Sequence, residues 1–167
     1  MQSLDILEFP DPRLRKVATP VENVTSEISE FADKLLYTMY QAIGIGLAAT
    51  QVNFHKRIIA IDISETKDNP LILINPVIVE SSGELETNEG CLSIPGFYEP
   101  VKRFEEISFK ALDKRGKEYE IQTKGILAIC VQHEIDHLEG KLFVDYISSA
   151  KRQLIRKKLK KAKQNMA

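Results

Sequence analysis

The sequence has no tryptophan, only two cysteines and no long apolar run. No stretch approaches the roughly 18 consecutive apolar residues of a membrane-spanning helix, and residues 1–10 lack the basic start and apolar core of a secretory signal. We therefore expect a cytoplasmic protein that does not contact membranes. The two cysteines, Cys91 and Cys130, are too few for a disulfide framework, so each is free to bind a metal or to pack in the core.

Acidic residues are missing altogether from the last part of the chain. Residues 151–167 contain eight Lys or Arg and no Asp or Glu, although the whole 167-residue chain has a formal net charge of only −1. This tail therefore carries +8, and residues 1–150 carry −9. We predict one domain, in which residues 1–150 form the body and residues 151–167 form a basic helical tail.

Periodic patterns of apolar residues predict both strands and helices. Strands are expected at residues 57–63, 71–79, 107–112 and 118–123, with Pro76 marking a bulge or an edge and a hairpin turn at 113–116. Helices are expected from Ser26 to about Gly44, from Ile126 until Gly140, and after Ser148, the last with Leu154, Ile155, Leu159 and Ala162 on one side. This order lacks regular strand-helix alternation. We predict an α+β fold of mostly antiparallel strands around a buried central helix, with an N-terminal and a C-terminal helix.

The most informative stretch is His133-Glu134-Ile135-Asp136-His137 within the predicted central helix. Residues four apart lie on the same face of a helix, so His133 and His137 can share one metal ion. Glu134 points to nearly the same face, where a carboxylate can take a proton from a metal-bound water. The pattern predicts a metal-dependent hydrolase. Its alternative is a surface helix that carries two histidines by chance.

A catalytic metal site uses three protein ligands, so a third ligand is needed. The position at which one large class of metallopeptidases has a third histidine is occupied by Phe143. A second class of metallopeptidases takes its third ligand, a glutamate, from a later helix. The acidic residues after Glu134 lie too close to it in the sequence to come from such a helix; they are Asp136, Glu139 and Asp145. Neither of these two classes therefore fits the chain.

A cysteine is the remaining candidate for the third ligand. Cys130 is about 10 Å along the helix axis from His137, which favours a place in a pocket or in the core. Cys91 follows Gly90 in a segment that ends at Pro95, which we expect to be an edge strand or loop where backbone amides can be exposed. We favour Cys91 as the ligand. His55 lies among charged residues, and its position favours a surface role.

The segment from Gly44 to Gln51 fits the dinucleotide-binding pattern G-x-G-x-x-A. That pattern requires a preceding strand and a following helix, whereas a predicted helix comes before it here and a predicted strand follows. We reject a dinucleotide site. The glycines instead allow the backbone to approach another group closely, and Gln51 supplies an amide that can donate a hydrogen bond.

Three segments together resemble the motifs of the peptide deformylase family, in order and at similar spacing. They are Gly44 to Gln51, Glu89-Gly90-Cys91-Leu92-Ser93, and Gln132 to His137. The resemblance extends over essentially the whole chain and implies a single catalytic metallohydrolase domain in residues 1–150. The implied activity is removal of the formyl group from the N-terminal formylmethionine of newly synthesised polypeptides, with release of formate.

The resemblance also implies roles for individual residues. Cys91, His133 and His137 would bind one Fe(2+) ion, which zinc, nickel or cobalt can replace. Hydroxide on the metal would attack the formyl carbon, with Glu134 as general base and acid. The side chain of Gln51 and the backbone N–H of Leu92 would donate hydrogen bonds to the developing oxyanion. Substrate contacts are implied for the backbone of Gly46 and for a methionine pocket that consists of Ile45, Ile129, Cys130 and the flank of His133.

Further expectations concern the outer parts of the molecule. Residues 96–100 would form a loop beside the peptide groove, and there the sequence differs from several bacterial relatives. The basic tail resembles a helix that contacts the ribosome in bacterial relatives, and its eight cations suit a phosphate backbone. No feature of the sequence predicts sequence-specific binding of nucleic acid.

Two alternatives differ from this prediction in function. One is a metallopeptidase or amidase that uses the same metal helix on another acyl group. The other is a structural metal module whose main function is ribosome binding, which requires a closed site with a fourth protein ligand. We find no fourth residue that is suitably placed. Asp136 lies off the ligand face, and we expect it to anchor the helix through a basic partner such as Arg103.

Overall fold

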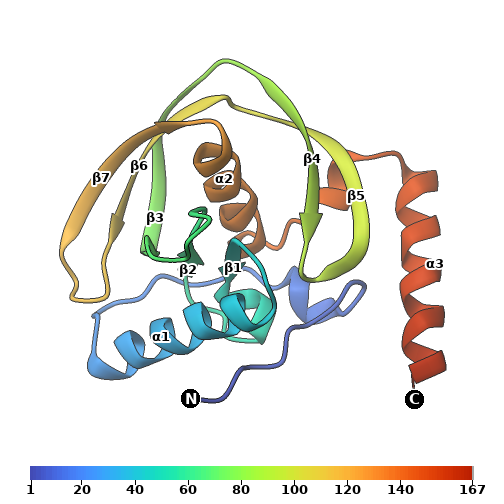
Figure 1. Cartoon of the computed structure of the whole chain (residues 1–167), viewed down its shortest axis with the longest axis horizontal. Helices are drawn as coiled ribbons and strands as arrows, with labels where there is room; N and C mark the ends of the chain where they lie inside the picture. The colour runs from blue at the N-terminus through green and yellow to red at the C-terminus, as the bar shows by residue number, and fades with distance from the viewer. Residues whose placement is uncertain (167) are drawn as a thin grey trace.

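The computed structural model describes residues 1–166 and consists of two antiparallel sheets that flank one central helix (Figure 1). The five-stranded sheet has the order β1 (Gly46–Ala48), β2 (Ile58–Ile61), β3 (Leu71–Ser82), β6 (Glu106–Leu112) and β7 (Glu118–Lys124). The second sheet pairs β4 (Leu85–Cys91) with β5 (Ile94–Arg103). The helices are α1 (Ser26–Gln41), α2 (Ile126–Leu138) and α3 (Ser149–Met166), with short 3-10 turns at Pro12–Arg15, Ala49–Val52 and Phe143–Tyr146. The predicted α+β fold is therefore confirmed.

The two sheets are parts of one bent ribbon that passes around α2. Strands β3 and β6 pair as far as Ser82 and Glu106, and the same two chain segments pair again from Leu85 and Arg103 as β4 and β5. Figure 1 shows these two arms on opposite sides of α2. The bend brings the end of β4, where Cys91 lies, to the side of the helix away from β3 and β6.

The four predicted strands are present, but β1 and β5 were not predicted, and β4 was anticipated only as an edge strand or loop around Cys91. β1 has only three residues, β4 is mostly polar, and β5 contains Pro95 and Pro100, which weaken a strand pattern. Prolines are tolerated in β5 because a two-stranded sheet leaves one edge of each strand free. Residues 96–100 therefore belong to a strand, and the expectation of a loop there was wrong. Pro76 marks a bulge, since the register of β3 against β6 shifts between Ile74 and Val77.

Helix α2 is the centre of the fold because most of its residues are buried. Its Ala128, Val131 and Leu138 pack in one core cluster with side chains of the large sheet, among them Ile59 and Phe109. A second cluster joins α1 to β2, and a third joins the N-terminal arm, β5 and α3. The apolar start of the predicted central helix thus corresponds to a helix that is enclosed on several sides.

The ends of the helices follow from local hydrogen bonds. Thr25 caps α1, its side chain accepting a bond from the Ile28 N–H at 3.3 Å. α1 ends at Gln41, three residues before the predicted end at Gly44. After α2, Gly140 adopts the left-handed conformation with a φ of 76°, as predicted for a residue that ends a helix.

Helix α3 is attached to the body by few side chains. Ser148 precedes it, and its hydroxyl accepts a bond from the Lys151 N–H at 3.2 Å, as expected of a capping residue. Of the four apolar residues predicted on one side, Ile155 and Leu159 are buried, whereas Leu154 and Ala162 are exposed. That part of the prediction was wrong because Leu154 lies about 100° around the helix from Ile155 and faces solvent, and because Ala162 lies beyond the last buried residue, Leu159. Residue 167 of the predicted tail lies outside the described residues.

Within residues 1–166, none of the helices combines the length and the apolar character needed to cross a bilayer.

We predict that Gly140→Ala lowers the free energy of unfolding by about 1–3 kcal/mol, because the left-handed conformation is unfavourable for alanine. A Cβ at this position would also lie 2.5 Å from the backbone oxygen of Arg15. Denaturant unfolding followed by circular dichroism measures the change. Lys141→Ala, at the exposed neighbouring position, is the control and should remain within about 0.5 kcal/mol of the parent protein. Equal stability of the two variants would contradict the prediction.

Candidate metal centre

Three side chains from two elements converge on one point beside α2. Cys91 ends β4, and His133 and His137 lie one turn apart on α2. The Nε2 atom of His137 is 3.2 Å from the Cys91 Sγ atom and 3.2 Å from the His133 Nε2 atom. Within the described residues these three side chains form a group whose ligand atoms all lie within 4.8 Å of one another. The structure therefore brings together the three residues that the sequence analysis proposed as ligands.

The chemistry of this group fits a metal ion. A thiolate and two imidazoles suit Zn(2+) and Fe(2+). The Nδ1 atom of His133 lies 2.8 Å from the Glu89 Oε1 atom, and this hydrogen bond leaves the His133 Nε2 lone pair free for a metal. Burial lowers the pKa of His137 well below its usual range, which favours the neutral imidazole that metal binding requires.

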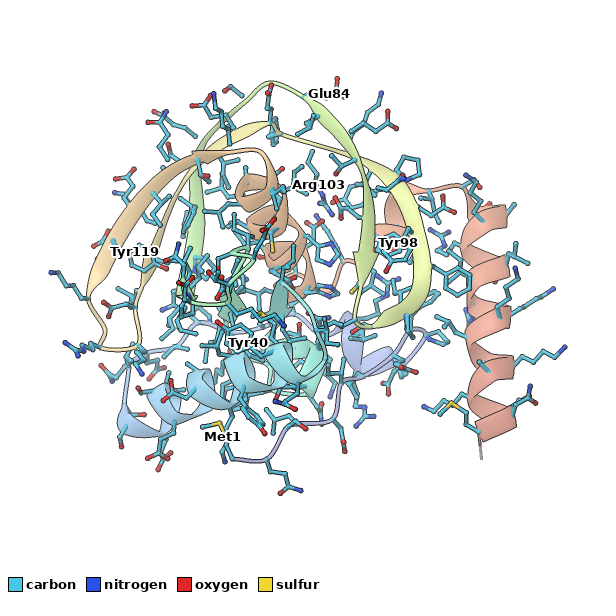
Figure 2. All side chains as sticks on the ribbon, viewed as in Figure 1. Met1, Tyr40, Glu84, Tyr98, Arg103 and Tyr119 are labelled. Carbon is cyan, nitrogen blue, oxygen red and sulfur yellow. The ribbon has the colours of Figure 1, made fainter. Side chains whose placement is uncertain are left out.

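A chain of charged groups supports His133 from behind. Arg103 donates to both carboxylate oxygens of Glu89, at 2.7 and 2.8 Å, and to Asp136 at 2.6 Å (Figure 2 labels Arg103). The Tyr146 hydroxyl in turn donates to Asp136 at 2.7 Å. Burial alone would raise the pKa of Glu89, but the hydrogen bonds from Arg103 and His133 outweigh it and lower this pKa to about 2. The predicted pairing of Asp136 with Arg103 is confirmed.

Gln51 is held by both ends of its amide. Its Oε1 atom accepts from the Ala48 N–H at 2.9 Å, and its Nε2 atom donates to the Ser93 hydroxyl at 3.0 Å. The same Nε2 atom is 3.6 Å from the Cys91 Sγ atom. The amide donor of Gln51 therefore faces the metal group, in a fixed orientation.

Glu134 is buried against the backbone of β1. Its Oε1 atom has no hydrogen-bond partner among the described residues. Burial, with a smaller contribution from Glu89, raises the pKa of Glu134 to about 7, against the opposing effect of His133. A Cβ at Gly46 would lie 2.6 Å from the Glu134 Oε2 atom and 2.7 Å from the Cys130 Sγ atom. Glycine at position 46 thus allows β1 to approach α2 closely, as predicted from the sequence.

A cavity of about 590 Å³ opens beside the metal group. Its lining includes nine of the ten residues that the sequence analysis singled out: Ile45, Gly46, Gln51, Cys91, Leu92, Ile129, Cys130, His133 and Glu134. The tenth, His137, lies behind them and touches Cys91 and His133. His55 lies elsewhere, its ring 3.1 Å from the backbone oxygen of Arg13. The arrangement gathers a metal group, a carboxylate and an amide donor at one apolar cavity, which suits hydrolysis of an amide.

Sequence reasoning missed several residues of this region, among them Glu89, Ser93, Ile43 and Tyr98. Glu89 could have been found, because residues two apart in an extended segment point to the same side and Glu89 precedes Cys91 by two. Ser93 and Tyr98 required the position of the β4–β5 hairpin, which the sequence did not predict, and Ile43 required the turn that ends α1.

Comparisons with known proteins point to one family. A family model described as polypeptide deformylase matches residues 3–153. The chain is 57% identical over 161 residues to a peptide deformylase of Nitrosococcus oceani, covering 96% of each chain, and 53% identical over 165 residues to one of Tolumonas auensis, covering 99% of each. A crystal structure of a peptide deformylase from Legionella pneumophila aligns with a TM-score of 0.94 at 47% identity, over 99% of this chain and 98% of that one. One from Ehrlichia chaffeensis in complex with actinonin also gives 0.94, at 40% identity, over 97% and 98%.

We predict that Glu89→Gln lowers the affinity for Zn(2+) by about 10- to 100-fold, because the carboxylate that orients His133 and strengthens it as a ligand is lost. Competition with a chelator measures this affinity, and circular dichroism checks that the variant is folded. Glu86→Gln, at an exposed position of the same strand, is the control and should bind Zn(2+) like the parent protein. If both variants bound Zn(2+) equally well, Glu89 would have no role in positioning the ligand.

Proposed function

The chain belongs to the peptide deformylase family, and we propose how the residues around its cavity carry out the reaction of that family. The enzyme hydrolyses the N-formyl group of the N-terminal formylmethionine of newly synthesised polypeptides and releases formate. The observation that carries the proposal is the convergence of Cys91, His133 and His137 with Glu134 and Gln51 at one cavity.

Cys91, His133 and His137 would hold the metal ion. A bound divalent metal lowers the pKa of a coordinated water by several units and polarises the carbonyl that is attacked. We propose Fe(2+) as the metal, following the family resemblance, with zinc, nickel or cobalt as replacements. Two imidazoles and a thiolate are compatible with each of these ions, so availability would decide which one is bound.

Glu134 would transfer the proton in this reaction. Its carboxylate is buried at the cavity, next to the ligand His133, and its Oε1 atom makes no hydrogen bond to the described residues. It can therefore accept a proton from the attacking water and pass that proton to the leaving amine of the methionine. The close contact with Gly46 holds the carboxylate in place on one side.

Gln51 and Leu92 would stabilise the negative charge that develops on the formyl oxygen. The amide nitrogen of Gln51 is fixed next to Cys91 by its bonds to Ala48 and Ser93. Leu92, whose backbone N–H would be the second donor, lies in the turn that follows Cys91 and lines the cavity. Loss of one such donor typically costs about 3 kcal/mol of transition-state stabilisation.

The substrate would bind along β1. This strand is at the edge of the five-stranded sheet, so the backbone of Gly46 is available to an extended peptide. Ile45, Ile129 and Cys130 would form the pocket for the methionine side chain. Burial raises the pKa of the Cys130 thiol and keeps it uncharged, which suits a pocket for a thioether.

Two further parts of the proposal concern the surroundings of the enzyme. We assign catalysis to residues 1–150 and a ribosome contact to the basic tail 151–167, whose cations are mostly exposed on α3. Because its substrates are polypeptides newly made on ribosomes, we place the enzyme in the cytoplasm.

Membership of the family argues against the two alternatives from the sequence. A peptidase or amidase for another acyl group would require a different family, and a structural module would require a fourth protein ligand. The metal group within the described residues has three members.

We predict that Glu134→Ala retains its metal but releases formate from a formylmethionyl peptide about 10²- to 10⁴-fold more slowly, because the proton acceptor is lost. Cys91→Ala should instead lose the metal. Elemental analysis together with a formate-release assay distinguishes the two effects. Glu120→Ala, at an exposed position of β7, is the control and should match the parent enzyme. An active, metal-loaded Cys91→Ala enzyme would disprove the ligand assignment, and full turnover by Glu134→Ala would favour a structural module.

We predict that neutralising exposed cations of α3 weakens co-sedimentation with ribosomes at low salt while leaving formate release unchanged. The variant combines Lys157→Gln, Lys158→Gln and Lys161→Gln, which keeps the buried Ile155 and Leu159. A control with the same change in charge combines Lys110→Gln, Lys117→Gln and Lys124→Gln on β6, β7 and the loop between them. Equal co-sedimentation of both variants and the parent would refute a ribosome contact through this helix.

A further inference from the structure

The mouth of the cavity carries large apolar side chains that are exposed to solvent. Ile43 is 82% exposed, Tyr98 71%, Ile126 64% and Ile45 51%, and all four line the cavity. Clustered apolar groups of this kind mark places where another molecule binds. Ile45 already belongs to the proposed methionine pocket, which leaves Ile43, Tyr98 and Ile126 without a partner. We refer to these three residues as the apolar rim.

Ile43 occupies a backbone position that normally favours glycine. α1 ends in a Schellman motif, in which the Ile43 N–H bonds to the Tyr40 oxygen and the Gly44 N–H bonds to the Met39 oxygen, both at 3.0 Å. These bonds hold Ile43 in the left-handed conformation, with a φ of 58°, which is unusual for a β-branched residue. An isoleucine here is unfavourable for the backbone and also leaves an apolar side chain in water. Because neither the backbone conformation nor the exposed side chain stabilises the fold, we infer that this side chain has a role in binding.

Tyr98 reaches the cavity from the opposite strand pair. Alternation along β5 directs its neighbour Phe97 into the core cluster next to α3, and Glu99 towards Lys151 at 3.4 Å. Tyr98 therefore points to the other face of β5, where its ring lies so close to Gly90 that a Cβ there would overlap it (Figure 2 labels Tyr98). The ring rests on backbone on one side and remains open on the other.

Exposed charges are absent from the cavity lining among residues 1–166. The only carboxylates that line it, Glu89 and Glu134, are buried, and no lysine or arginine lines it. This is unusual for a chain in which 28% of the residues are charged. A charged side chain of a peptide would lose contact with water at this mouth without gaining an ionic partner.

We propose that the apolar rim binds the side chains that follow formylmethionine in the substrate, so that this enzyme prefers apolar or aromatic residues there and disfavours residues of either charge. The inference rests on the proposed deformylase function and deepens it. An extended peptide that leaves the methionine pocket along β1 would pass Ile43, which follows the end of α1, Ile126, which begins α2, and Tyr98 on β5, since all three line the same cavity. The rim replaces the water that such apolar side chains would otherwise contact.

The experiment compares formylmethionyl tripeptides that carry Leu, Phe, Asp or Lys at the second or the third position, with the other position held as Ala. Formylmethionyl-alanyl-alanine is the reference substrate. We expect kcat/KM for Leu and Phe to exceed that for Asp and Lys about 5- to 10-fold at one position or both, mainly through KM. Formate release from none of the peptides, the reference included, would mean that the proposed function fails. Formate release from all of them at equal kcat/KM would overturn the apolar rim alone.

Two variants test whether the rim causes the preference. Ile43→Asn should reduce the ratio of kcat/KM for apolar over charged peptides about two- to fivefold. Asparagine tolerates the left-handed backbone, so folding is preserved. Tyr98→Lys should specifically improve kcat/KM for the Asp peptides. Leu154→Gln removes an exposed apolar side chain from α3, away from the cavity, and should leave the preference intact. A preference that persists unchanged in both Ile43→Asn and Tyr98→Lys would overturn the assignment.

Discussion

The metal centre depends on one buried guanidinium. Arg103 comes from β5 and binds a carboxylate from each of two other elements, Glu89 of β4 and Asp136 of α2. A buried charge without partners is strongly unfavourable, so the β4–β5 hairpin can dock on α2 only where all three groups meet. That docking places Cys91 opposite His133. The two halves of the metal group, which are far apart in the sequence, are thereby brought into register by a contact that involves neither the metal nor the substrate.

The residues of the site were easier to predict than the structure that assembles them. The spacing of His133 and His137 requires only the geometry of one helix, and the residue types of the three motifs were sufficient to identify the family. The strands β4 and β5 were missed because their polar residues and prolines give no strand pattern, although pairing and docking stabilise them. Local propensity cannot report such tertiary contacts. For this reason the roles of Glu89 and Tyr98 became visible only in the structure.

Two errors at the helix ends have similar causes. The apolar periodicity of α1 continues beyond Gln41, but the Schellman motif ends the helix there and turns Ile43 outwards. The periodicity of α3 predicted four apolar residues on one side, yet the body covers only Ile155 and Leu159. A pattern shows which residues of a helix are apolar. It does not show which of them a partner covers.

The close approach of Gly46 to α2 has a consequence for how the enzyme can evolve. Any side chain at this position would collide with the Glu134 carboxylate and the Cys130 sulfur, so the strand cannot change there without moving the proton acceptor. The hydrogen-bonding groups that β1 presents at this point belong to the backbone, which substitution does not remove. An inhibitor that takes its main contacts from this backbone would leave the enzyme few single-residue routes to resistance. An inhibitor that depends on the side chains of Ile43 or Tyr98 would leave the enzyme several such routes to resistance.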